Sequence, residues 1–183
     1  PLQKALILEL ARAGAADEAL RRLDEFDAQD DNTDEAIDLL RKVCDQTDRS
    51  SQFVDRLVSM AKRSGRLPAK LAIARLLIDE QQSSQAAQVL SDVVEADPSQ
   101  SEAWILLARL RLKLGDPDQA IVVLHQILNG EDAADRLVRD FIREARSSGM
   151  LPRLIDAAKR SAAANSGDAA SAFLVASFLF ASG

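Results

Sequence analysis

Four arginines lie at helical spacing near the C-terminal end of the chain and could bind an anion. They are Arg136, Arg139, Arg143 and Arg146, and their spacings of three, four and three residues place four guanidinium groups on one face of a helix. These groups repel one another unless negative charge lies between them, and each can hold two oxygens of a carboxylate or phosphate. The stripe therefore predicts a site for an acidic peptide, a carboxylate or a phosphate group.

The alternative interpretation of the arginine stripe is a solvated helix face. Asp135, Asp140 and Glu144 are close in sequence and could pair with the arginines. Ion pairs of this kind at the surface contribute little to stability and imply no ligand. The sequence alone leaves both interpretations open.

The residues that most enzymes use for catalysis are scarce. His125 is the only histidine and Cys44 the only cysteine, so one chain cannot build a metal cluster or a Cys–His pair. The glycines are scattered, and none belongs to a phosphate-binding loop. We therefore expect no enzymatic activity, no metal and no cofactor.

The most acidic segment, residues 26–38, has to be considered as a calcium site. An EF-hand loop needs a glycine at its sharp turn and a glutamate at its twelfth position. The segment FDAQDDNTDEAID contains no glycine. Asn32 and Glu35 instead predict a helix N-cap with its capping-box acid.

Composition predicts the helices that must carry the arginines. The 183-residue chain is 47% hydrophobic and 28% charged, has 4% aromatic residues and lacks Tyr, and helix-forming Ala and Leu dominate it. A formal net charge of −6 disfavours a nucleic-acid partner, because binding phosphates requires a basic surface. No stretch has the length of a membrane span. Arginine outnumbers lysine, which we interpret as a hint of a GC-rich bacterial genome.

Apolar and small residues between positions 101 and 134 follow the spacing of two antiparallel helices. This stretch resembles one tetratricopeptide repeat (TPR), in which the pattern W-x-x-L-G packs the first helix, a glycine forms the turn and apolar residues form the core of the second helix. Ala108 replaces the usual glycine, and Arg111 replaces the usual aromatic residue. The residues that match are Trp104, Leu107, Gly115, Ala120, Leu124 and Ile127.

The resemblance implies an all-α fold, a right-handed superhelix (α-solenoid) of about five helix-turn-helix repeats and a final helix. We expect one domain, residues 1–183, with repeats at about 1–32, 33–66, 67–100, 101–134 and 135–167 and a terminal helix at 168–181. The second repeat departs most from the pattern, because its turn lacks a glycine and its second helix lies about one residue out of phase. The chain begins at Pro1 and ends at Gly183 after an apolar helix, so we expect it to be a fragment of a longer protein.

The TPR resemblance also implies a function, the binding of a peptide or a partner's extended segment in a concave groove lined by the first helix of each repeat. The partner would be a protein or peptide, and an acidic one would suit the basic groove residues. The carboxylate clamp of some TPR co-chaperones is not expected, because the asparagines that it requires are absent from the matching positions. The basic residues at groove positions are Arg75, Arg109, Lys113, Arg136, Arg139, Arg143 and Arg146.

A second hypothesis is a structural or oligomerising scaffold in a bacterial envelope or export assembly. The terminal helix carries apolar residues on most of its circumference, as expected if another repeat or a second copy covers it. Phe173, Phe178 and Leu179 would make that contact. The sequence does not choose between a cytoplasmic and a periplasmic location.

Overall fold

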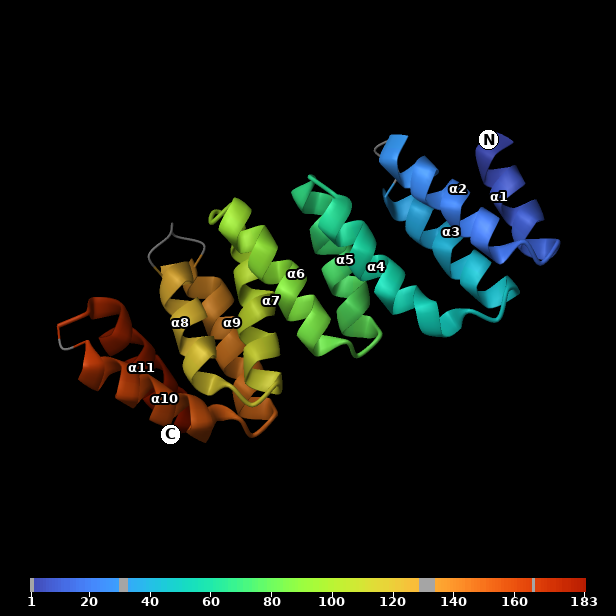
Figure 1. The fold of residues 1–183 in the computed structure, drawn as a ribbon. Helices are drawn as coiled ribbons and strands as arrows, with labels where there is room; N and C mark the ends of the chain where they lie inside the picture. Colours follow the sequence, from blue (N-terminus) through green and yellow to red (C-terminus); the bar gives the residue numbers. More distant parts are fainter. Residues whose placement is uncertain (1, 30–32, 129–133, 166) are drawn as a thin grey trace. The chain divides into compact units, whose positions relative to one another are not determined.

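The protein folds into helices throughout the part of the chain that the structure describes. The computed structural model describes residues 2–29, 33–128, 134–165 and 167–183, and within these ranges it contains eleven α-helices, one short 3-10 helix and no strand (Figure 1). This confirms the predicted all-α fold of helix-turn-helix repeats with a final helix. The helices are α1 (Leu2–Arg12), α2 (Ala16–Gln29), α3 (Thr33–Gln46), η1 (Ser50–Gln52), α4 (Phe53–Arg63), α5 (Leu67–Asp79), α6 (Ser83–Ala96), α7 (Ser101–Lys113), α8 (Pro117–Leu128), α9 (Ala134–Ser147), α10 (Leu151–Ala164) and α11 (Ala169–Ser182).

The chain divides into two compact units, residues 1–89 and 90–183, and the boundary lies inside α6. In the first unit, α1, α2 and α3 pack against one another, and α4 packs against α3 and α5. In the second unit, α7 packs along α8, α8 packs against α10, and α11 packs against α10, α9 and α8. The expectation of a single domain with the repeat boundaries given above stays a prediction.

Each helix pair is joined by a turn that contains one residue with a left-handed backbone. These residues are Gly14, Asp48, Gln81, Gly115 and Gly149, with φ between 54° and 84°, and they lie 34, 33, 34 and 34 residues apart. In every turn the N–H of the next residue donates to the carbonyl five residues earlier, at 2.7–2.9 Å, the bond that ends a helix in a Schellman motif. The single 33-residue interval, between Asp48 and Gln81, places the first two repeats one residue out of phase with the later ones.

Substitutions in two of these turns should change the backbone strain in opposite directions. Gln81 adopts φ 61° with a side chain, whereas Gly115 adopts φ 84° and has open space where a Cβ would lie. A left-handed backbone costs an L-residue about 1–2 kcal/mol. We expect Gly115→Ala to lower the free energy of unfolding by about 1 kcal/mol and Gln81→Gly to raise it by about 0.5 kcal/mol. Urea unfolding followed by circular dichroism measures both, and a stabilising Gly115→Ala would contradict the left-handed turn.

The helix pair α7–α8 has the packing that the TPR pattern predicts. The indole of Trp104 is half-buried, and its Nε1–H donates to the carbonyl oxygen of Pro98 at 2.8 Å. Trp104 therefore connects the start of α7 to the loop that precedes it. The matching positions Leu107, Ala108, Ala120, Leu124 and Ile127 are all buried.

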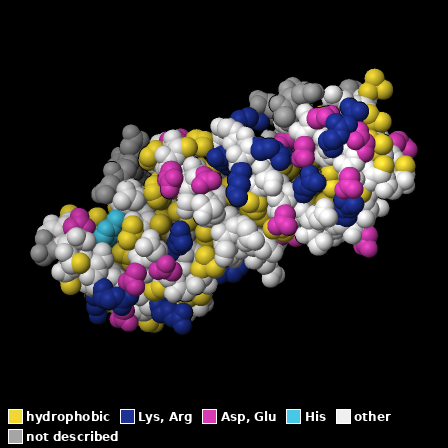
Figure 2. All heavy atoms as spheres, viewed as in Figure 1, with side chains coloured by type: hydrophobic (Ala, Val, Ile, Leu, Met, Phe, Trp, Pro, Cys, Tyr) yellow, Lys and Arg dark blue, Asp and Glu magenta, His cyan; other side chains and the backbone are white. Residues whose placement is uncertain are grey.

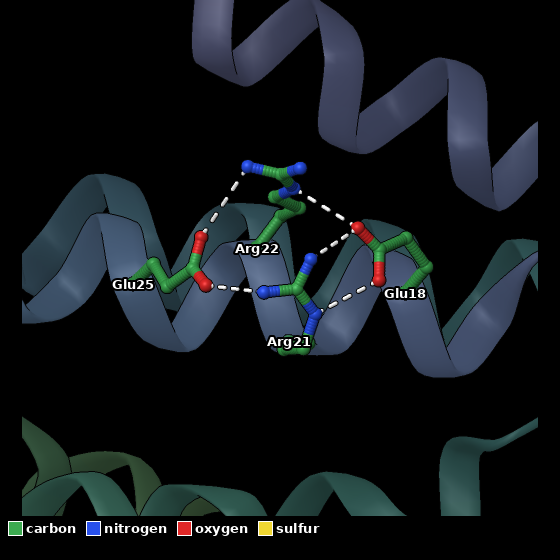
Figure 3. Close-up of polar contacts among 4 residues, drawn as sticks. All are labelled: Glu18, Arg21, Arg22 and Glu25. Carbon is green, nitrogen blue, oxygen red and sulfur yellow. Dashed lines mark hydrogen bonds and ion pairs between the residues drawn. The ribbon is translucent and has the colours of Figure 1, made fainter.

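Helix α2 carries a network of four charged side chains on its surface (Figure 3). The Nε–H of Arg21 donates to Glu18 at 2.8 Å and that of Arg22 at 3.0 Å, while Glu25 pairs with both arginines from the other side. The hydrogen bonds from Arg21 and Arg22 lower the pKa of Glu18 from 4.5 to about 2. Ion pairing is therefore part of the surface structure of the first unit.

The lowered pKa of Glu18 predicts a specific loss of stability in acid. A carboxyl group whose pKa is lower in the folded than in the unfolded chain stabilises the fold above its unfolded pKa, and this contribution is lost as the pH falls through the folded pKa. We expect the free energy of unfolding to fall between about pH 4.5 and pH 2, and we expect Glu18→Gln to reduce the slope. Urea titrations at several pH values measure it, and an unchanged slope in the variant would show that Glu18 does not contribute.

Candidate partner-binding site

A pocket opens between α9 and α11 in the second unit. Its volume is about 420 Å³, within the range of ligand pockets in proteins. Arginines of α9 form one side of it, and mainly apolar residues of α11 form the other. The pocket thus joins the arginine stripe and the exposed face of the last helix, which the sequence analysis assigned to separate hypotheses. It is lined by Arg139, Ile142, Arg143, Arg146, Phe173, Ser177, Phe180 and Ala181.

The amphipathic character of α9 places the arginines at the pocket. Successive residues of a helix are about 100° apart, so Arg139 and Arg146, seven residues apart, lie within about 20° of each other on the circumference. Arg143 lies between them along the axis. The opposite face of α9 packs into the core through Val138, Phe141 and Ala145, which are all buried. Ile142, also buried, lies closer to the arginines and borders the pocket.

The arginines at the pocket are only weakly neutralised. Arg143 lies 3.2 Å from Asp140 one turn away, and its side chain is 79% exposed, so this ion pair contributes little. Among the residues that the structure describes, no acidic side chain lies within ion-pair distance of Arg139 or Arg146. Arg143 thus has an acidic neighbour, whereas Arg139 and Arg146 have none among the described side chains. The side chain of Asp135 lies outside the described residues, so both interpretations of the stripe stay predictions.

Several arginines elsewhere in the chain lie close to acidic side chains. Arg56 and Arg63 both lie 2.9 Å from Asp24, and Arg160 lies 2.6 Å from Asp118. On the face drawn in Figure 2, basic and acidic side chains are interspersed over the helices of the first unit. Arg139 and Arg146 therefore differ from these arginines, each of which lies close to an acidic side chain.

The other basic residues predicted to bind a partner do not line the pocket. The Nε of Arg109, on α7, lies 2.9 Å from a carboxylate oxygen of Glu144. The geometry of this contact is not that of a hydrogen bond, so the two residues form only an ion pair. Glu144 is about 100° from Arg143 around α9, on the flank that faces α7. Lys113 and Arg136 are exposed outside the pocket lining, and Arg75 is exposed on α5 in the first unit.

The phenylalanines of α11 separate into a buried and an exposed set. Phe178 is 0% exposed and belongs to the core of the second unit, which corrects the expectation that it is available to a partner. Leu174, four residues earlier, and Ser171 are buried on the same stripe. Phe173 is 39% exposed and Phe180 90% exposed, and both lie at the pocket.

Leu179 lies on a different face of α11 from the pocket. Its side chain is 44% exposed, and helical geometry places it about 100° from Phe180 and about 120° from Phe173. The terminal helix therefore has two separate apolar surfaces, where the sequence predicted one. One belongs to the pocket with the arginines, and the other carries Leu179 beside small residues.

Sequence reasoning missed four residues that line the pocket, Ile142, Ser177, Phe180 and Ala181. Phe180 could have been found by placing α11 on a helical wheel, because it shares a face with Phe173. Ile142 and Ser177 carried no signal of their own. They reach the pocket only because α9 and α11, which α10 separates in the sequence, pack side by side.

A polar cluster that connects α8 to the start of α11 also has no signal in the sequence. Asp168 caps α11 by accepting the backbone N–H of Ser171 at 2.9 Å and its hydroxyl at 2.6 Å, and these bonds lower the pKa of Asp168. The Nε2 of His125 lies 3.3 Å from the Ser171 hydroxyl. The Nδ1 of His125 lies 3.9 Å from Asp168. Ser171 is buried and its hydroxyl donates to Asp168, so Ser171 and Asp168 form the cap of α11 and His125 packs beside it.

No arrangement typical of metal binding is present in the described ranges. These residues contain no group of three or more His, Cys, Asp or Glu side chains that could hold a metal ion. Asn32, the predicted N-cap, lies outside the described residues. Among the described helices, none combines the length and the apolar character needed to cross a bilayer.

Comparisons with known proteins identify the family. The chain is similar over 98% of its length to two crystal structures from Podosopora anserina, one of nearly identical TPR-like repeats assigned to a kinesin light chain and one of a single-residue variant of the same repeats. The identities are 16% and 17%, 93% and 92% of those chains are covered, and the TM-score is 0.37 for both. No curated protein sequence matches significantly. A family model of the tetratricopeptide repeat matches residues 28–110 and 77–140, together more than half of the chain. The chain therefore belongs to the tetratricopeptide repeat family.

Proposed function

We propose that the protein is a non-catalytic interaction scaffold that binds a segment of another protein at the pocket between α9 and α11. TPR repeats generally mediate protein–protein interaction, and they are typically scaffolds without catalytic activity. The proposal assigns this general role to one described surface of this chain. The predicted involvement of Arg75, Arg109, Lys113 and Arg136 remains a separate prediction.

The main support for the proposal is that two arginines without an acidic neighbour lie beside exposed aromatic rings. Arg139 and Arg146 have no acidic neighbour among the described side chains, and Phe180 is 90% exposed beside them. Exposed apolar surface beside charged side chains is typical of binding sites. A partner that supplies carboxylates and apolar side chains would satisfy both groups.

A peptide-display selection tests the proposed function even though the natural partner is unidentified. The full chain, immobilised through one terminus, would be used to select from a library of random peptides. Selected peptides would then be synthesised and titrated by isothermal titration calorimetry. We expect saturable binding with one peptide per chain. A library that yields no saturable binder would overturn the proposal.

The oligomerising scaffold remains a second candidate because Leu179 lies exposed on the face of α11 away from the pocket. Light scattering of the full chain over a range of concentrations measures its oligomeric state. If α11 joins two copies, Leu179→Glu should convert a dimer into a monomer, because it places a charge in an apolar contact. Phe180→Glu on the pocket side is the matched control, and an effect of Phe180→Glu alone would place the contact at the pocket. A monomer at all concentrations would exclude this candidate for the chain.

A further inference from the structure

We infer that the pocket between α9 and α11 binds an extended peptide segment in which acidic and bulky apolar side chains alternate. The inference rests on the proposed function and names the class of partner. It follows from the chemistry of the two pocket walls, from their placement on opposite sides, and from the spacing of the arginines along α9.

The two walls require different side chains from the same ligand. On α9, Arg139, Arg143 and Arg146 present guanidinium groups that form strong hydrogen bonds to carboxylates. On α11, Phe173 and Phe180 present aromatic rings that gain stability when apolar groups remove them from water. A ligand that is only acidic would leave the rings in water, and a ligand that is only apolar would leave the arginines without carboxylates.

An extended chain presents these two kinds of side chain in opposite directions. Successive side chains of an extended segment point to opposite faces, so alternate residues can face α9 while those between them face α11. Arg139 and Arg143 are separated by about 6 Å along the helix axis, at 1.5 Å per residue. Alternate residues of an extended chain are about 6.6 Å apart. Acidic residues at alternate positions therefore match the arginines along α9.

The size of the pocket and the charge of the protein disfavour other ligands. A helix with its side chains is about 10–12 Å wide, whereas the pocket encloses about 420 Å³ and accommodates individual side chains. A nucleic acid would offer phosphates to the arginines, but the chain carries a formal net charge of −6, which repels a polyanion. An extended acidic and apolar peptide satisfies the pocket with the fewest opposing interactions.

Two synthetic peptides of identical composition test the inference. One has the core Glu-Leu-Glu-Phe-Glu and the other the core Glu-Glu-Glu-Leu-Phe, both with glycine and serine on either side and a fluorescent label. Fluorescence polarisation with the full chain measures their affinities. We expect the alternating peptide to bind at least tenfold more tightly than its isomer. Equal affinities would overturn the inference, because charge and hydrophobicity alone would then explain binding.

Matched protein variants locate the binding. Arg139→Gln with Arg146→Gln should weaken binding of the alternating peptide at least tenfold, as should Phe173→Ala. The control Arg153→Gln with Lys159→Gln changes the net charge equally at two exposed positions of α10 outside the pocket and should leave the affinity within twofold. Binding that is insensitive to the pocket variants, or a labelled single-stranded oligonucleotide that displaces the peptide with similar affinity, would contradict the inference.

The outcomes separate this inference from the proposed function. If display-selected peptides bind but the alternating peptide does not, the inference is wrong and the proposed function stands. If neither the selected peptides nor the alternating peptide binds, both are wrong. Circular dichroism of each variant identifies loss of structure, and a variant that unfolds would be replaced by Phe180→Ala, whose side chain is 90% exposed.

Discussion

Replacing Phe178 by Ala should lower the free energy of unfolding by about 3–5 kcal/mol, the usual cost of removing a buried phenylalanine. Its ring is 0% exposed, and α11 packs against α10, α9 and α8. The truncation would remove apolar contacts and leave a cavity that the three neighbouring helices cannot readily close. This loss would be large compared with the total stability of a typical domain.

The matched control for Phe178 lies two residues further along the same helix. Phe180 is 90% exposed, so Phe180→Ala should change the free energy of unfolding by less than about 0.5 kcal/mol. Urea denaturation of both variants measures the difference. Equal destabilisation by the two substitutions would mean that α11 is rotated about its axis relative to the arrangement described, and the pocket would then lose Phe180 as a lining residue.

Reversing the charge of the pocket should remove most of its affinity for an acidic peptide. We expect Arg139→Glu combined with Arg143→Glu to weaken binding of a display-selected acidic peptide at least tenfold, which corresponds to about 1.4 kcal/mol or more. Each guanidinium–carboxylate hydrogen bond contributes about 1.5–3 kcal/mol when it is shielded from water, and reversal adds repulsion. Both side chains are exposed, so the helical content and melting temperature should remain nearly unchanged.

Salt provides an independent check on the charge reversal. Affinity for the wild-type chain should fall as ionic strength rises, because the arginines are exposed and therefore screened. The control Arg153→Glu with Lys159→Glu produces the same change of net charge on α10. If this control weakens binding as much as the pocket reversal does, the effect comes from total charge, and the assignment of the site to α9 is wrong.

The sequence predicts the fold well because its signals are local. The apolar positions around Trp104 and the turn residue Gly115 define a helix pair without any information about distant contacts. The turns at Asp48 and Gln81 are less visible in the sequence, because residues other than glycine adopt φ values of 54° and 61° there. The repeat period indicates roughly where they lie, and the 33-residue interval between them places the first two repeats one residue out of phase with the later ones.

The site is only partly predictable, because its walls come from two helices, α9 and α11, that are not consecutive in the sequence. The spacing of Arg139, Arg143 and Arg146 alone identifies them as candidates. Phe173, Phe178 and Phe180 are the same residue type on one apolar helix, and only packing against α8, α9 and α10 shows which of them is buried. The ion pair between Arg109 and Glu144 is also invisible in the sequence, because it depends on which flank of α9 faces α7.

A charge exchange between protein and peptide tests the proposed binding site most directly. The alternating peptide and a version with lysine in place of each glutamate would be titrated against the wild-type chain and against the variant Arg139→Glu with Arg143→Glu. If the pocket binds the acidic side chains, the variant should bind the lysine peptide more tightly than the glutamate peptide, with a coupling energy that a double-mutant cycle measures. A variant that binds the glutamate peptide as tightly as the wild-type chain does, with no gain for the lysine peptide, would contradict the assignment of partner binding to the pocket between α9 and α11.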